Sequence, residues 1–199
     1  MIHRDKQIIK AVEKFRCLER YHIERMFFNH CQRPQNNANI SLKRLRDRGY
    51  LVKAPSRMPY VYIPKSNTSI KRNSNKIDHF LAIADTFIDL AQPKTFDIEP
   101  RFNADVRPDI WVVFRNSPFY FEVQRTVYSQ KVMQKKIDLY EEFYKSGEWQ
   151  SFKWQPKNKK VFPYVILLSD CKYDLKTKNV KVFQFKSVHD ILITLQTAK

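Results

Sequence analysis

The chain has 199 residues, 43% of them hydrophobic and 14% aromatic, so it is long enough to bury one core or two smaller ones. Its formal net charge of +17 favours polyanionic partners: DNA, RNA or an anionic membrane surface. Only 2 glycines are present, which excludes a Walker A loop, a G-x-G-x-x-G dinucleotide fingerprint and a G-x-S-x-G nucleophile elbow.

The cysteine pattern and hydropathy bear on the compartment. Cys17, Cys31 and Cys171 are scattered and form no C-x-x-C pair, as expected for thiols in a reducing environment. No apolar run approaches the length of a membrane span. We therefore expect a cytoplasmic protein with no membrane partner.

The positive charge is concentrated in the first third of the chain. Residues 1–75 carry 17 Lys and Arg against 5 Asp and Glu, whereas residues 76–199 carry 20 against 15. The first third is thus the stronger candidate for binding a polyanion.

Three short helices are predicted in that third. Apolar residues recur at helical spacing over 5–15 and about 19–29. A third helix is expected to have Pro34 in its first turn and to end at Gly49. The sequence "YLVKAPSRMPYVYIP" then predicts a β-hairpin. Three helices followed by a hairpin indicate a winged helix-turn-helix domain over residues 1–66.

In such a domain the third helix enters the major groove of DNA and the hairpin touches the backbone or the minor groove. Asn can pair with adenine, and Lys or Arg with guanine or phosphate; Ile40 would meet a thymine methyl. A basic surface that is merely solvated is the alternative, as is binding of RNA or protein. The predicted DNA-binding residues are Asn36, Asn37, Asn39, Lys43, Arg44, Arg46 and Arg57.

A polar, basic stretch over residues 67–75 reads as a linker. The segment "KIDHFLAIADTFIDLAQ" follows it as an amphipathic helix, which would either bridge two domains or cover a sheet. We assign it to a second domain over residues 76–199.

Two aromatic and β-branched runs, "DIWVVF" and "FYFEVQ", predict antiparallel strands joined by "RNSP". This connection would pair Asp109 with Gln124 and Trp111 with Glu122, leaving Asp109, Glu122 and Gln124 on one face. Clustered carboxylates can be neutralised by a divalent cation, and Glu99 could supply a third. Glu99, Asp109 and Glu122 are therefore candidate ligands for Mg²⁺ or Mn²⁺.

A basic helix over 129–147 and an apolar strand over 162–170 complete a helix–hairpin–helix–strand order. This order, with "RPD" and "FEVQ", resembles the PD-(D/E)XK nuclease fold, an α/β/α architecture. Gln124 stands where that motif has lysine. A helix lysine, Lys131 or Lys135, would have to replace it, so the candidate catalytic residues are Glu122, Gln124 and Lys135.

Taken whole, the chain resembles the bacterial replication-relaxation family of plasmids and other mobile elements. The resemblance is carried by "LRDRGYLVK", the histidine-bearing helix, the "PD" and "FEVQ" strands and "KKIDLYEEFY", over about residues 5–170. It implies an α+β protein with a winged helix-turn-helix followed by a nuclease-like domain, and a role in plasmid replication and DNA relaxation.

Three functions remain open, one of them a protein-interaction module that acts against a host factor. The first is a DNA-binding protein of a plasmid, phage or other mobile element that controls replication or transcription. Its partner is double-stranded DNA, and its second domain would serve a homodimer or a host or replication protein, with no cofactor. The second is a DNA endonuclease or nickase dependent on Mg²⁺ or Mn²⁺.

Overall fold

The computed structural model describes the chain except residues 1, 56, 67–69, 72, 103–105 and 198–199. It is a mixed α and β protein, as expected, and divides into two compact units, Met1–Gln92 and Pro93–Lys199. The division differs from the predicted boundary at residue 76. Part of the predicted linker, residues 67–69 and 72, lies outside the described residues.

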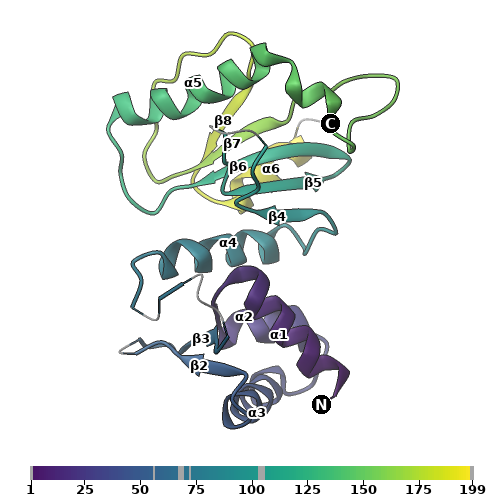
Figure 1. Cartoon of the computed structure of the whole chain (residues 1–199), viewed down its shortest axis with the longest axis vertical. Coiled ribbons are helices and arrows are strands. Elements are labelled where there is room, and N and C mark those ends of the chain that lie inside the picture. The colour runs from purple at the N-terminus through teal and green to yellow at the C-terminus, as the bar shows by residue number, and fades with distance from the viewer. Residues whose placement is uncertain (1, 56, 67–69, 72, 103–105, 198–199) are drawn as a thin grey trace. The chain divides into compact units, whose positions relative to one another are not determined.

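The first unit contains the three predicted helices and a small three-stranded sheet (Figure 1). Pro34 begins the third helix, and Gly49, at a φ of 75°, follows its end, so both predicted end signals are confirmed. The elements are α1 (His3–Phe15), β1 (Leu18–Glu19), α2 (Arg20–Phe27), α3 (Pro34–Asp47), β2 (Leu51–Lys53), β3 (Val61–Pro64) and α4 (Ile77–Asp89).

The sheet of the first unit is antiparallel, with strand order β1-β3-β2. Leu18 pairs with Tyr62 on one side of β3, and Val52 pairs with Ile63 on the other. β3 is therefore the central strand. The short strand β1 was not predicted from the sequence. This pairing ties the β2–β3 hairpin to the segment between α1 and α2.

The apolar stripes of the helices form the core of this unit. Ile8, Val12 and Phe15 of α1 are buried, as are Leu42 and Leu45 of α3. The amphipathic helix α4 packs against α1, α2 and β1, so it belongs with the first unit. The apolar side of α4 could pack against other helices as well as against a sheet. The sequence alone therefore did not decide whether this helix bridges two domains or covers the sheet.

The second unit is a five-stranded sheet with order β4-β5-β6-β7-β8 (Figure 1). β5 runs antiparallel to both of its neighbours, β4 and β6, whereas β6, β7 and β8 are parallel. The elements are β4 (Phe96–Ile98), β5 (Ile110–Phe114), β6 (Ser117–Val123), α5 (Gln130–Ser146), the 3₁₀ helix η1 (Glu148–Ser151), β7 (Tyr164–Leu168), β8 (Val182–Phe185) and α6 (Val188–Thr197).

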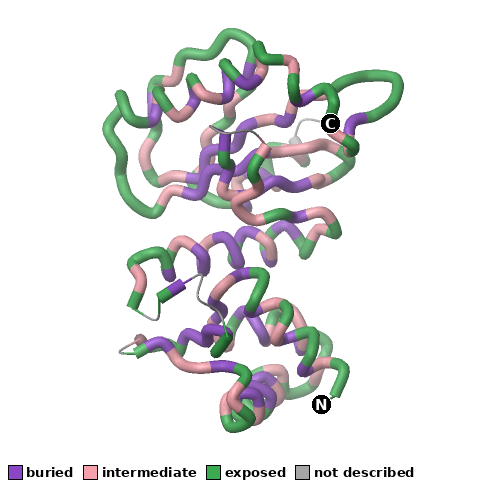
Figure 2. Tube along the Cα trace, in the orientation of Figure 1, coloured by how far each residue is buried: buried purple, intermediate pink, exposed green. Residues whose placement is uncertain are grey.

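α5 connects β6 to β7 and covers one face of the sheet (Figure 1). Trp111, Tyr120 and Val165 from the strands meet Ile137 and Tyr140 of α5 in an aromatic-rich core. Figure 2 shows this burial along the inner side of α5 and the central strands. The face that carries Tyr120 and Glu122 is therefore a packed interior and not a wet surface.

The β5–β6 turn differs from the prediction. It consists of Arg115 and Asn116 alone, with φ values of 48° and 61°, the conformation that suits the right-handed twist of a two-residue hairpin. Ser117 and Pro118 extend β6 instead of forming the turn. The pairing consequently shifts by two residues, so Trp111 faces Tyr120, and the predicted pairs Asp109–Gln124 and Trp111–Glu122 are wrong.

Candidate nucleic-acid interface and buried acidic cluster

The outward face of α3 carries amides, one aliphatic side chain and one lysine. Asn36, Asn39, Ile40 and Lys43 are exposed, and Ile40 is 60% exposed. Their spacing of three, four and seven residues places them on one side of a helix with about 3.6 residues per turn. Asn37, half-buried, lies at the edge of this group.

Arg44, predicted to contact DNA, is half-buried and bound to a buried carboxylate of the first unit. Its Nε donates to Asp5 Oδ2 at 2.9 Å and its Nη2 to Asp5 Oδ1 at 2.6 Å. Asp5 on α1 is fully buried, and the hydrogen bond to it raises the pKa of Arg44. This forked pair fixes α3 to α1 and engages the guanidinium that was predicted to contact DNA.

The other two predicted arginines are also paired, but their carboxylate partners are exposed. Arg46 donates to its neighbour Asp47 at 2.8 and 3.2 Å. Arg57, in the turn between β2 and β3, donates both Nη atoms to Asp78 of α4, at 2.5 and 3.0 Å. Exposed ion pairs of this kind contribute little free energy, so a phosphate can compete for either arginine.

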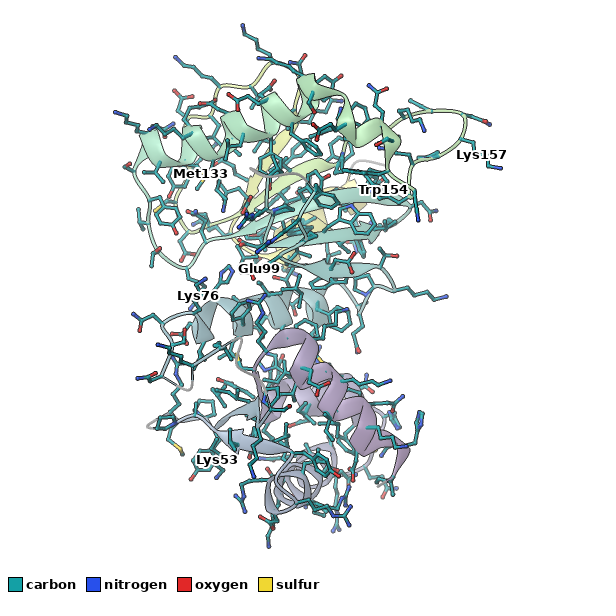
Figure 3. All side chains as sticks on the ribbon, viewed as in Figure 1. Lys53, Lys76, Glu99, Met133, Trp154 and Lys157 are labelled. Atoms are coloured by element: carbon teal, nitrogen blue, oxygen red, sulfur yellow. The ribbon has the colours of Figure 1, made fainter. Side chains whose placement is uncertain are left out.

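The tip of the β2–β3 hairpin presents apolar and aromatic side chains. Met58 is 79% exposed and Tyr60 is 45% exposed. Lys53, on β2 (Figure 3), places its Nζ 3.2 Å from the centre of the Tyr60 ring. The hairpin thus adds a cation–aromatic pair to the surface of the first unit.

In the second unit, Asp109 immediately precedes β5 and Glu122 lies near the end of β6. Extending the observed pairing by one residue puts Asp109 opposite Glu122, and Asp109 Oδ2 accepts the Val123 N–H at 2.7 Å. The sequence prediction that these two acids come together on one side of the hairpin therefore agrees with the structure, although the register was wrong.

Glu122 is 1% exposed and surrounded by hydrogen donors. Tyr140 of α5 donates its hydroxyl to Glu122 Oε1 at 2.5 Å, and Lys136, one turn earlier, forms an ion pair with Glu122 Oε2. Burial raises the pKa of Glu122 to about 7, and Lys136 only partly offsets this. Burial acts to lower the pKa of Lys136, but Glu122 and Asp109 outweigh it and raise that pKa.

The lysine beside the acid is Lys136 and not the predicted Lys135, which is exposed like Lys131. The spacing of buried residues along α5 distinguishes Lys136 from Lys135. Met133, Ile137 and Tyr140 mark the buried side of α5, and Lys136 lies three residues after the first and four before the last. Lys135 points to the opposite side, because it is out of phase with this stripe.

The remaining predicted residues do not complete a metal site. Gln124 lies at the end of β6, where its Oε1 accepts from the Tyr173 hydroxyl at 3.2 Å. The Glu99 N–H donates to the Asp109 carbonyl at 2.9 Å. Across the described residues, no three His, Cys, Asp or Glu side chains gather in a way that could hold a metal ion. With both Glu122 oxygens engaged, the residues present do not fit a divalent metal centre.

The sequence model of the replication-relaxation family matches residues 9–157, so the chain belongs to this family. The matched range runs from α1 to the loop after η1, and it includes both the outward face of α3 and the Glu122 cluster. No curated protein and no solved structure matched the chain. None of the helices in the described part of the chain is long and apolar enough to span a membrane.

Proposed function

We propose that this protein binds double-stranded DNA through its first unit and acts in replication or transcription control of a plasmid, phage or other mobile element. The observation that carries the proposal is the outward face of α3. Between Pro34 and Arg46 the helix has no acidic residue, and its exposed groups are hydrogen-bonding amides, one isoleucine and one lysine. Membership of the replication-relaxation family supports the same role.

The arrangement around α3 supports a winged helix-turn-helix. The order helix, strand, helix, helix, hairpin, with β3 central in an antiparallel sheet, matches that layout. α2 and α3 would form the helix-turn-helix, with α3 in the major groove, and the β2–β3 hairpin would be the wing. Arg57 and Lys53 on the hairpin are placed to reach phosphates once their present partners are exchanged.

A lysine-rich loop supports additional DNA contact by the second unit. Lys153, Lys157, Lys159 and Lys160 are all exposed, and the chain has no Asp or Glu from Trp149 to Ser169. Gln155 fixes the base of this loop through hydrogen bonds to the Trp149 carbonyl and to both backbone groups of Val161. Figure 3 labels Lys157 at the outer end of the loop.

Binding is tested by fluorescence anisotropy with a labelled duplex of mixed sequence at several salt concentrations. Lys43→Gln is expected to weaken binding and to lower the salt slope by about one ion. Lys145→Gln, an exposed lysine on α5, is the matched control. Equal affinity and slope for the two variants would refute the role of α3.

A second candidate function, a DNA endonuclease, is favoured by one observation: Lys136 on the helix after the hairpin contacts Glu122, as a displaced PD-(D/E)XK lysine would. The burial of Glu122 and its engagement by Tyr140 oppose it. Here α5 and the β5–β6 hairpin fit the nuclease order, while the helix before the hairpin, α4, belongs to the first unit.

The two functions are separated by incubating supercoiled plasmid with the protein and Mg²⁺ or Mn²⁺, with EDTA and Glu122→Gln as controls. We expect retarded but uncut plasmid in every lane. Metal-dependent nicking that disappears in the variant would establish the endonuclease instead.

A further inference from the structure

We infer that α3 reads A·T base pairs in the major groove, with Asn36 and Asn39 pairing with adenine and Ile40 contacting the thymine methyl group. The inference rests on the proposed function and specifies its ligand. It follows from which side chains of α3 are free to meet DNA and which are occupied within the protein.

The exposed polar groups near the start of α3 are all carboxamides. Gln35, Asn36 and Asn39 are exposed carboxamides, each able to donate and accept at once. Ile40, beside Asn39, is 60% exposed and so does not contribute its side chain to the core. Lys43, one turn further along, is the cation that shares this face.

Arginine is the usual partner of guanine, and both arginines within α3 are bound by carboxylates. Arg44 is bound in forked geometry by the buried Asp5. Arg46 is hydrogen-bonded to Asp47 and lies beyond the amides, toward the C-terminal end of α3. In helix-turn-helix proteins the residues near the start of the recognition helix contact base edges, and here those residues are amides.

Base chemistry then selects the pair. Adenine offers N7 as acceptor and N6 as donor, which one carboxamide satisfies in two hydrogen bonds. Guanine offers two acceptors, N7 and O6, which leave a carboxamide oxygen facing an acceptor. Thymine adds a methyl group in the same groove, and the exposed Ile40 can bury it. Lys43 is left to contact a phosphate.

The test uses duplexes with single-atom or single-group changes. A preferred duplex is first selected from a random pool with the full chain. Thymines in it are then replaced by deoxyuridine, which lacks only the methyl group, and adenines by 7-deazaadenine, which lacks the N7 acceptor. Affinity is measured for the unmodified protein, Ile40→Ala and Asn39→Ala, with Val132→Ala, an exposed apolar residue of α5, as control.

We expect a selected site containing A·T pairs. Deoxyuridine at the contacted position should weaken binding several-fold in the unmodified protein and in Val132→Ala, and should have no effect in Ile40→Ala. Replacing the contacted adenine by 7-deazaadenine should lower the affinity about tenfold, as the loss of a bidentate pair does. In Asn39→Ala, which lacks the carboxamide, the same replacement should leave the affinity unchanged. Because both side chains are exposed, circular dichroism should show unaltered folding in these variants.

The outcomes separate the two claims. A selected site of G·C pairs, or equal sensitivity of Ile40→Ala and the unmodified protein to deoxyuridine, overturns A·T readout. Equal affinity for all duplexes overturns readout and leaves DNA binding standing. Absence of duplex binding, or preference for RNA, overturns the proposed function and the inference with it.

Discussion

Arg44 and Lys43 are adjacent basic residues of α3 with different roles. Arg44→Ala leaves the carboxylate of Asp5 buried without its partner, which should lower the free energy of unfolding by about 3 kcal/mol. Lys43→Ala removes an exposed side chain and should change it by less than about 0.5 kcal/mol. Urea unfolding of both variants measures the difference, and similar stabilities would contradict the structural role of Arg44.

Lys136 is the residue that keeps Glu122 compatible with the core. Since the folded-state pKa of Glu122 is raised from 4.5 to about 7, this group's contribution to stability is complete below pH 4.5 and is lost as pH rises through 7. Lys136→Met should raise that pKa further, so the free energy of unfolding should keep falling at higher pH. Above neutral pH the variant should be less stable than the unmodified protein by about 2–4 kcal/mol.

Urea unfolding across this pH range tests the prediction, with Lys135→Met as the exposed control. The added change Glu122→Gln should remove most of the pH dependence from Lys136→Met. If the two lysine variants share one pH profile, the ion pair has no energetic role.

Sequence reasoning identified Asp109 and Glu122 but not their partners, for physical reasons. Alternation along a strand shows which side chains share a face, but it does not show that α5 buries that face. Arg44 could not be distinguished from the neighbouring basic residues of α3. Its sequence context does not reveal that it pairs with Asp5, a carboxylate 39 residues away. Such pairings arise only when α1 and α3 pack together.

Glu141 links α5 to the loop that leads into β8. Its carboxylate accepts the backbone N–H groups of Lys178, Asn179 and Val180, at 2.7–3.2 Å. Burial acts to raise its pKa, but these hydrogen bonds outweigh it and lower the pKa to about 2. Its contribution to stability is therefore present above pH 4.5 and is lost as pH falls through about 2.

Glu141→Gln should lower the free energy of unfolding at neutral pH by about 1–3 kcal/mol, the cost of weakening hydrogen bonds to a charged group. The effect should shrink in acid, because the unmodified protein loses the same contribution there. Denaturation at neutral and acidic pH measures it, with the exposed neighbour Glu142→Gln as control. A loss that stays constant with pH would contradict the assignment.

Most elements in the matched part of the chain were predicted, because their periodicity is local. Pro34 and Gly49 mark α3, and the aromatic runs mark β5 and β6. β1, β8 and α6 were missed: β1 has two residues and exists through its pairing with β3, while β8 and α6 follow an irregular crossover. The β5–β6 register was wrong because the sequence "RNSP" fits a four-residue turn as well as a two-residue turn.

Each unit carries exposed positive charge that could contact DNA: α3 and its hairpin in the first, and the lysine loop in the second. Replacing Lys153, Lys157, Lys159 and Lys160 by Gln should reduce the salt dependence of duplex binding by up to about four ions. Replacing Lys172, Lys176, Lys178 and Lys181, also exposed, makes the same change in net charge. Identical salt slopes for the two variants would show that only net charge matters.

The most direct measurement is an NMR titration of the labelled full chain with the selected duplex, following backbone amides and the side-chain amides of asparagine. We predict that the largest shifts fall on α3 and the β2–β3 hairpin, with the side-chain amides of Asn36 and Asn39 among them, while the region around Glu122 of β6 and Tyr140 of α5 stays unchanged. Shifts confined to the second unit, with α3 unaffected, would contradict DNA recognition by the first.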